Sequence, residues 1–355
     1  MVVLWNSSAL ASMELLEKRV RSRFSGRQVL FMPPPCPARA LDILCDAHAR
    51  EVILNVQGKA AGVAYIDKKT GQERVVKARA VILAASSGET ARILLNSRAK
   101  RPEGVANSSG LVGKYIMDTV GAGLGGRVPA FENLPVHNED GAGAHVYVPW
   151  WLYRQQHAGK LDFARGYHIE FTTGRQAPNL NVAGPAGPGY GKSFKEELRR
   201  TYGSFVGFSG RGEMIPNKDS FCELDPTVKD KWGIPVLRFH WKWSSHELNQ
   251  AAHMQRTFKE MIEAAGGVAG TPTTGDKAIK PGGFIIHEVG GGIMGADRSK
   301  SVTNSWNQCW DIPNLVLNDG SAFASNADKN PTLTIMALAW RACDHLIEEM
   351  RKGNL

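Results

Sequence analysis

The stretch HEVGGGIMGAD, residues 287–297, sets a histidine and a glutamate directly in front of three consecutive glycines. A histidine can exchange a proton near neutral pH, so His287 is a candidate general base. Glycines 290–292 carry no side chain and would let the backbone approach a flat ligand closely. A glycine-rich stretch can equally be an ordinary turn. Taken alone, this stretch fits both a loop that does chemistry and a flexible connection.

A second candidate, Asn330, lies in the stretch DGSAFASNADKNPTLT, just before a strongly helical sequence. We predict that Asn330 is the N-cap of this final helix and that Pro331 holds the favoured first helical position. Lys352 and Gly353 are expected to close the helix. The free N–H groups of a first helical turn suit an anionic or electron-rich ligand edge. Asn-Pro is also a common capping pair, so Asn330 becomes specific only in combination with His287.

Apolar residues recur along the final helix at the spacing of a single helical face, which is typical of a helix that packs on a core. The predicted stripe consists of Leu333, Met336, Ala337, Trp340, Cys343, Ile347 and Met350.

The elements that must position these residues are clearest after residue 37. Residues 38–49 (ARALDILCDAHA) fit a short helix, and residues 50–86 fit three strands with turns at QGKA and KKTGQE. The run from Ala80 to Ala85 is continuously apolar, which predicts burial on both faces. A helix, ETARILLNS, follows it.

Residues 121–285 have a different character, because glycine and proline are frequent and strand-like runs are separated by turns. This pattern predicts an antiparallel sheet apart from the first region. One helix interrupts it, with Ser244 or Ser245 as N-cap and Gly266–Gly267 at its end. His145, His168 and His240 lie on strand-like runs beside tryptophans, an arrangement that fits an aromatic-lined sugar pocket or, more often, packing on a sheet face.

The bulk composition excludes several classes of protein. The formal net charge is +9, but basic and acidic residues alternate, as on solvated faces, so we do not expect a nucleic-acid partner. No apolar run is long enough to span a bilayer, and the first residues do not form a secretory signal. The five cysteines include no CxxC pair, so neither a metal site nor a disulfide framework is expected.

Taken together, the C-terminal stretches carry a resemblance to a known family. Residues 287–344, from HEVGGGIMGAD through NLVLNDGS to NPTLTIMALAWRACD, resemble the C-terminal signature of the glucose–methanol–choline (GMC) oxidoreductases. Within that family they look like the branch that includes sugar and glucoside dehydrogenases and pyranose oxidase. ARAVILAASSGETARILLNS and NSSGLVGKYIMD also resemble the family's cofactor domain. The resemblance covers residues 41–120 and 205–355 well and 121–204 only loosely.

The resemblance implies a fold of class α/β plus α+β. Its first component is a partial FAD- or NAD(P)-binding, Rossmann-like domain, and its second is an inserted substrate domain built on an antiparallel sheet. Residues 1–120 would form the partial FAD-binding domain and residues 121–285 the substrate domain. Residues 286–355 would return to the FAD-binding domain with the catalytic motifs.

The resemblance also implies FAD as cofactor and hydride transfer from a CH–OH group of a sugar or glycoside to flavin N5. His287 would take the hydroxyl proton, and Asn330, which cannot accept a proton, would orient the hydroxyl. Pro331 and Thr332 would place the helix dipole at the flavin pyrimidine edge. Asp319 and Gly320 would touch the ribityl–phosphate region. The electron acceptor, whether a small subunit, a cytochrome, a quinone or oxygen, stays open.

The chain departs from the family in one respect, because it contains no strand–GxGxxG–helix unit for the FAD diphosphate. The glycine-rich strings at residues 121 and 185 lie in the wrong place and are not assigned to phosphate binding. We therefore expect a truncated chain, and a second hypothesis is an inactive fragment or a subunit that cannot bind FAD alone. A third is a carbohydrate-binding module that uses the tryptophans. The sequence predicts no location.

Overall fold

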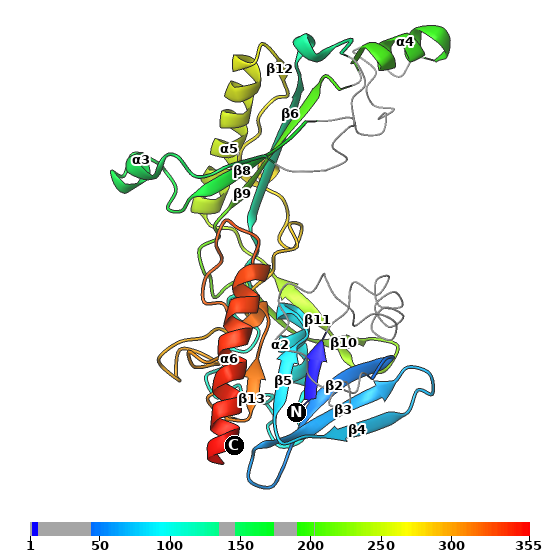
Figure 1. Ribbon diagram of the computed structural model, residues 1–355, viewed down its shortest axis with the longest axis vertical. Coiled ribbons are helices and arrows are strands. Elements are labelled where there is room, and N and C mark those ends of the chain that lie inside the picture. The colour runs from blue at the N-terminus through cyan, green and yellow to red at the C-terminus, as the bar shows by residue number, and fades with distance from the viewer. Residues whose placement is uncertain (1, 6–43, 135–145, 174–189, 202) are drawn as a thin grey trace, which may run out of the picture.

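A computed structural model describes the chain in five segments, residues 2–5, 44–134, 146–173, 190–201 and 203–355. The described residues form two lobes joined end to end (Figure 1). The α/β lobe, in the lower half of the figure, holds strands β1–β5, β10, β11 and β13 with helices α2 and α6. The sheet lobe, in the upper half, holds strands β6–β9 and β12 with helices α3–α5. This mixed architecture confirms the predicted fold class.

A parallel sheet of three strands lies at the centre of the α/β lobe. β5 (Val81–Ala84) runs between β1 (Val2–Trp5) and β13 (Leu315–Leu317). Val81, Ile82 and Leu83 are at most 2% exposed, which confirms the predicted burial on both faces. Ile82 packs with residues of α6, whereas Val81 and Leu83 join the core under the antiparallel sheet. α2 (Ser87–Asn96) follows β5 at once and confirms the helix expected there.

The antiparallel sheet beside it contains β2 (Ala47–Leu54), β3 (Ala60–Asp67) and β4 (Glu73–Lys77). The helix predicted for residues 38–49 is wrong in its described part, since the chain turns at 44–46 and then enters β2. Ala47 and His48 already pair with β3, and this ladder outweighs the weak helix preference of an alanine-rich segment. Residues 50–86 hold parts of four strands, one more than predicted.

The sheet lobe is built on one antiparallel sheet of five strands. Their order is β12 (Val268–Ala269), β6 (Val120–Arg127), β9 (Phe205–Gly212), β8 (Tyr167–Thr173) and β7 (Val146–Val148). α5 (Ser245–Ala264) covers one face of this sheet (Figure 1). It begins at Ser244, as predicted, because Ser244 and Glu247 form a reciprocal capping box. The glycine-rich string at residue 121 is strand β6, which the sequence interpretation missed.

Close packing explains the glycines of β6. A Cβ at Gly126 would lie 2.6 Å from the carbonyl oxygen of Val268 and 2.8 Å from Ile262 of α5. Glycine therefore lets the neighbouring edge strand and helix approach the C-terminal end of this strand.

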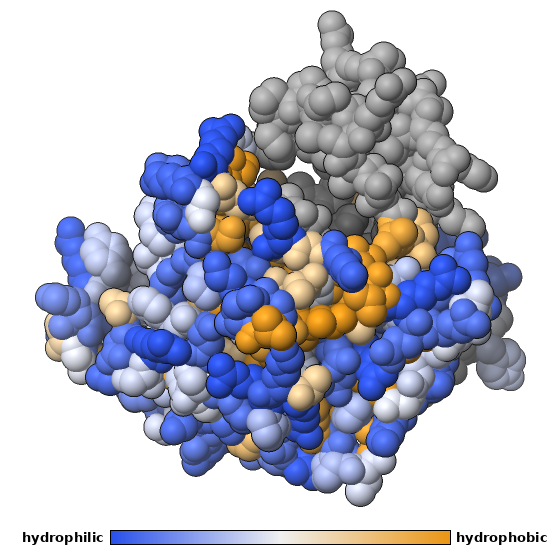
Figure 2. Space-filling model, turned by 90° about the horizontal axis from the view of Figure 1, so that it is seen from below, coloured by the Kyte–Doolittle hydropathy of each residue, from blue (hydrophilic) through white to orange (hydrophobic). Residues whose placement is uncertain are grey.

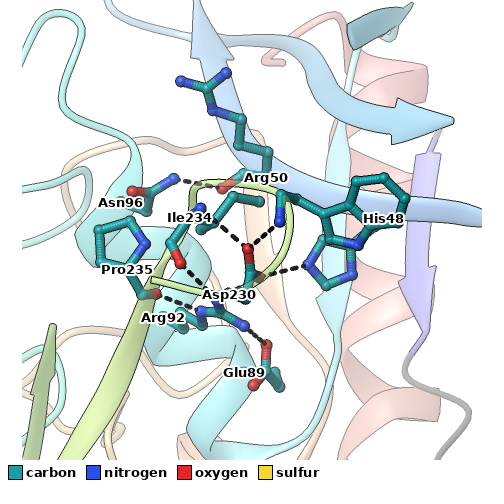
Figure 3. Close-up of polar contacts among 9 residues, drawn as sticks. His48, Arg50, Glu89, Arg92, Asn96, Asp230, Ile234 and Pro235 are labelled. Atoms are coloured by element: carbon teal, nitrogen blue, oxygen red, sulfur yellow. Dashed lines mark hydrogen bonds and ion pairs between the residues drawn. The ribbon is translucent and has the colours of Figure 1, made fainter. Parts of the chain in front are cut away.

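The hairpin of β10 (Phe221–Lys229) and β11 (Pro235–His240) packs on α2, so the segment 121–285 contributes to both lobes. Arg92 of α2, only 8% exposed, holds the hairpin turn (Figure 3). Its guanidinium donates to the Asp230 carboxylate at 2.7 Å and to the carbonyl oxygens of Ile234 and Pro235 at 3.2 and 2.8 Å. The same carboxylate lies 3.5 Å from Nε2 of His48 on β2.

The remaining elements are short or peripheral. They are α3 (Tyr153–His157), α4 (Gly191–Thr201) and the 3-10 turns at Pro129–Phe131, Gly275–Lys277 and Gly320–Ala322.

The final helix, α6 (Thr332–Lys352), differs from its prediction at the start. The N-cap position is Pro331, not Asn330, and no side chain caps the first turn. The predicted end is confirmed, since Gly353 adopts the left-handed conformation. The predicted packing through the apolar stripe is confirmed at Cys343 and Met350, which pack on the core, but it is wrong at Leu333 and Trp340, which are 71% and 56% exposed. The helix rests on the parallel sheet mainly through Ala342 and Leu346.

The end of the α/β lobe can be seen in Figure 2 as a mainly hydrophilic face crossed by one hydrophobic band. Among the described residues, no helix combines the length and apolarity needed to cross a bilayer.

Candidate active site

His287 lies where the two lobes meet, and a buried carboxylate holds its backbone there. Asp118, which is fully buried directly before β6, accepts a hydrogen bond from the His287 amide at 3.0 Å through Oδ1. Its other oxygen accepts from the Ile285 amide at 3.1 Å, and Oδ1 also accepts from the Thr119 amide at 2.7 Å. One side chain thus ties the segment 285–287 to the start of the central sheet.

The His287 imidazole is half-buried, and one of its nitrogens has a partner. Nδ1 lies 3.2 Å from Oγ1 of Thr119. If the imidazole donates Nδ1–H to this hydroxyl oxygen, Nε2 keeps a lone pair that can accept a proton. Thr119 therefore suits a role in selecting the tautomer that a general base requires.

The electrostatic surroundings favour the neutral imidazole. Burial lowers the pKa of His287 below its ordinary value, and the Asp118 charge opposes this effect only in part. Arg211 also lowers this pKa, and Glu170 raises it. Because the net direction is downward, these surroundings favour the neutral imidazole, the form that a general base requires.

The three glycines after His287 have a different role from the one predicted. A Cβ at Gly290 would lie 1.9 Å from the carbonyl oxygen of Tyr115, and Gly290 also has a positive φ of 88°. A Cβ at Gly292 would lie 2.7 Å from Leu317 of β13. The space beside these glycines is filled by the protein itself. They let the loop pack on its neighbours, which corrects the expectation that they admit a flat ligand.

Asp319 and Gly320, predicted to touch the cofactor, lie directly after β13 and behind this loop. The buried Asp319 carboxylate accepts from the Ser321 amide at 2.8 Å and from the Thr90 hydroxyl. Burial raises the pKa of Asp319, against these hydrogen bonds. The Gly320 carbonyl accepts from the Gly290 amide at 2.8 Å. The Asp319 side chain is thus engaged internally, and a ligand would meet this turn mainly through its backbone.

The other predicted residues lie at the start of α6. Asn330 and Thr332 are exposed, Pro331 is partly exposed, and the amides of the first turn have no side-chain cap. Within the described part of the chain, Asn330 forms no hydrogen bond with His287. The asparagine that does contact the histidine is Asn326, whose amide group donates to the His287 carbonyl oxygen at 3.4 Å.

Two buried polar atoms, in residues that contact the loop from His287 to Gly292, have no partner among the described residues. They are Oδ1 of Asn326, a residue 2% exposed, and Oγ of Ser321, which is fully buried. Buried polar atoms are normally hydrogen-bonded. These two atoms, together with the uncapped first turn of α6, fit the polar edge of a bound cofactor better than a purely structural junction.

The site contains residues that sequence reasoning missed, namely Asp118, Thr119 and Asn326. Asp118 and Thr119 form a polar pair between a buried segment and the glycine-rich strand β6, a local signal that could have marked them. Nothing local shows that this pair meets His287, which lies far along the chain. Of the predicted histidines, His168 lies on the sheet face and His240 stacks on Phe221, while His145 falls outside the described residues.

No group of three or more His, Cys, Asp or Glu side chains that could hold a metal ion occurs in the segments that the structure describes. An α/β lobe joined to an antiparallel-sheet lobe, with a half-buried histidine at their junction, fits a class of cofactor-dependent enzymes.

The comparisons with known proteins identify the class more closely. The GMC oxidoreductase family is matched in two parts, its N-terminal model over residues 6–125 and its C-terminal model over residues 216–339. The chain belongs to the GMC oxidoreductase family. This is a family of FAD-dependent flavoenzymes, which agrees with the cofactor expected from the sequence.

Relatives of known activity cover most of this chain. The 2-methyl-1,2-propanediol dehydrogenase of Mycolicibacterium austroafricanum is 34% identical over 314 residues, which are 87% of this chain and 55% of that protein. The fructose dehydrogenase large subunit of Gluconobacter japonicus is 26% identical over 88% of this chain and 55% of its own. The C-glycoside 3-oxidase of Microbacterium trichothecenolyticum is 26% identical over 84% of this chain and 52% of its own. The chain thus spans about half the length of these relatives.

The fold has a counterpart among solved structures. The formate oxidase of Aspergillus oryzae matches with a TM-score of 0.60 at 14% identity, covering 86% of this chain and 60% of the oxidase chain. At this level of identity the likeness concerns the fold alone.

Proposed function

We propose that this chain acts as an FAD-dependent oxidoreductase that oxidises a CH–OH group of a sugar or glycoside. The observation that carries the proposal is the junction histidine. Its pKa is lowered, and its loop is fastened by Asp118 beside two unpartnered buried polar atoms. Relatives named as a diol dehydrogenase, a fructose dehydrogenase subunit and a glycoside oxidase support an alcohol as substrate.

In this proposal His287 is the base. With Nδ1–H donated to Thr119, Nε2 accepts the proton of the substrate hydroxyl as the C–H bond breaks. FAD, when bound, supplies the acceptor for the hydride at N5. Asn330 orients the hydroxyl, because an amide can donate and accept hydrogen bonds but cannot take the proton. The uncapped α6 terminus at Pro331 and Thr332 offers positive N–H dipoles to the cofactor.

In this proposal Asp319 and Gly320 contact the cofactor through their backbone atoms, in the turn after β13, because the Asp319 carboxylate already accepts hydrogen bonds from Thr90 and Ser321.

The test uses the full chain supplied with FAD. We expect bound flavin absorbance and reduction of an artificial electron-accepting dye with at least one member of a panel of sugars, glycosides and diols. His287→Gln should lower the rate by about 100-fold or more, the usual contribution of a general base. His246→Gln, which changes an exposed histidine at the start of α5, is the matched control and should keep full activity. Bound flavin without dye reduction on any panel member, or a fully active His287→Gln, would refute the proposal.

A second candidate function is a flavoprotein subunit that holds FAD only in complex with a polypeptide carrying the diphosphate-binding unit. The exposed apolar side chains on the first half of α6 favour it, since Leu333, Met336 and Trp340 are 71%, 40% and 56% exposed. In that case the isolated chain would lose FAD during gel filtration. Co-expression with such a polypeptide would restore flavin binding, and Trp340→Glu would abolish the restoration.

A further inference from the structure

The central sheet of the sheet lobe has two unlike faces. Tyr167, Ile169 and Phe208 point to one face, where they form a core with α5. Because side chains alternate along a strand, the intervening residues His168, Glu170 and Arg211 point to the opposite face. The opposite face is also buried at His168 and Glu170, which are 0% and 5% exposed, but its side chains are charged or ionisable.

The charged side chains on this face form a connected network. Arg211 contacts Glu170, with a nitrogen–oxygen distance of 3.2 Å, and donates to the Ser209 hydroxyl at 2.6 Å. His168 lies between two carboxylates, with Nε2 3.5 Å from Glu170 and Nδ1 3.3 Å from Asp328. Asp328 belongs to the segment that leads into α6, so the network joins the sheet face to the loop that carries Asn330.

The strand register places this network beside His287. Gly121 of β6, Arg211 of β9 and His168 of β8 are paired in one row across the sheet. A Cβ at Gly121 would lie 2.3 Å from Cδ1 of Ile285, so the segment that leads to His287 crosses this row at its end. The charges of Arg211 and Glu170 also act on the His287 imidazole.

A structural role alone gives a poor account of these groups. Burying an ion pair costs desolvation energy that an apolar pair would not, and the sheet already has an apolar core on its other face. The Arg211 guanidinium has five N–H donors and the Glu170 carboxylate about four acceptor sites, and their contacts with each other and with Ser209, Gly210 and His168 use only part of this capacity. The remaining donor and acceptor capacity matches a hydroxyl group, which accepts and donates at once. The opposite charges of Arg211 and Glu170 leave no net charge to select an ion.

We propose that the Glu170–Arg211 pair binds the second hydroxyl of a substrate with two adjacent hydroxyls, while the first hydroxyl lies at His287. His168 and Ser209 are positioning residues that hold the pair. The substrate class is then a neutral vicinal diol, as found in sugars, glycosides and 1,2-alkanediols, and simple monohydric alcohols are poor ligands. This inference rests on the proposed function for the first hydroxyl, but it can be tested without turnover.

The first experiment measures binding. The full chain with added FAD is studied by saturation-transfer NMR with propane-1,2-diol and with propan-1-ol. We expect transfer to the diol at concentrations where the monohydric alcohol gives little. Glu170→Gln keeps the shape but removes the charge, and it should weaken diol binding about 10-fold to 100-fold, as for loss of a hydrogen bond to a charged group. Equal binding of both alcohols, or diol binding unchanged in Glu170→Gln, overturns the inference.

A matched control separates recognition from general damage. Glu223→Gln makes the same change in a carboxylate that contacts Arg238 on the β10–β11 hairpin, with both side chains 40–50% exposed. This variant should bind the diol like the unmodified chain. If Glu223→Gln weakens diol binding as much as Glu170→Gln does, the effect is not recognition and the inference fails.

The second experiment measures dye reduction with the same two alcohols. We expect Glu170→Gln to lower kcat/KM for the diol about 10-fold more than it lowers kcat/KM for propan-1-ol. Selective diol binding by an unmodified chain that reduces the dye with no member of the sugar, glycoside and diol panel would refute the proposed function and keep the binding inference. If the chain reduces the dye and Glu170→Gln lowers kcat/KM equally for both alcohols, the binding inference fails and the proposed function stands.

Discussion

Asp118 should control both the stability of the lobe junction and the placement of His287. Its buried carboxylate accepts three amide hydrogen bonds, from Thr119, Ile285 and His287. Two substitutions separate the contributions. Asp118→Asn keeps the shape and the oxygen that serves Thr119 and His287, but its amide group faces the Ile285 N–H. Asp118→Ala leaves all three amides without a partner.

The expected magnitudes follow from the number of orphaned donors. A buried donor left unsatisfied costs about 1–3 kcal/mol. Asp118→Asn orphans one donor and should lower the free energy of unfolding by about 1–2 kcal/mol, because it also removes the cost of burying a charge, the effect that raises the pKa of Asp118. Asp118→Ala orphans three donors and should lower the free energy of unfolding by about 3–9 kcal/mol.

Urea unfolding followed by tryptophan fluorescence gives the free energies, and dye reduction gives the activity. Both variants should lose activity, because displacing a catalytic group by about 1 Å can cost on the order of 100-fold in rate. If Asp118→Ala is no less stable than Asp118→Asn, the three hydrogen bonds do not hold the junction. If either variant retains full kcat, Asp118 does not position His287.

Three further predictions concern pH and packing. Since the His287 pKa lies below its ordinary value of about 6.5, kcat/KM should be constant above about pH 6.5 and should fall tenfold per pH unit below the His287 pKa. If the acidic decrease of kcat/KM in the pH profile is instead centred above pH 7, His287 is not the base. Asp230→Asn breaks the pair with Arg92 and should destabilise the chain at pH 7 by about 3 kcal/mol in urea unfolding. Burial alone would raise the pKa of Asp230, but hydrogen bonds from backbone amides and Arg92 outweigh it, and the net direction is downward. A carboxyl with a lowered folded-state pKa stabilises the fold above its unfolded pKa of about 3.9 and loses this contribution as the pH falls through the folded value. The difference in stability between Asp230→Asn and the unmodified chain should therefore shrink as the pH falls below about 4, and a difference that does not shrink contradicts this account. Gly290→Ala should abolish cooperative thermal unfolding, because its Cβ would overlap the Tyr115 carbonyl oxygen, whereas Gly58→Ala, at a similar positive φ with open space around it, should cost only about 1–2 kcal/mol; equal melting temperatures for the two variants would show that the loop can move aside.

The features that the sequence determined by itself are those encoded within a few residues. The start of α5 follows from Ser244 and Glu247, which meet within one helical turn. The end of α6 follows from Gly353, since glycine readily adopts the left-handed conformation. The buried strand β5 follows from its unbroken apolar run. The motif around His287 was also recognisable, because its residues are contiguous.

The features that only the tertiary structure decided depend on residues distant in the chain. The bond between Asp118 and His287 joins residues 169 positions apart, and no local pattern encodes it. The sequence interpretation did not assign the glycine-rich string of β6 to a strand, because its strand conformation depends on pairing with β9 and packing against α5. The placement of Arg211 beside His168 and Gly121 arises from the register of strands β9, β8 and β6, and no strand alone carries a pattern that predicts it. Long-range pairing and packing set these positions, because they depend on which surfaces meet rather than on the preferences of each segment.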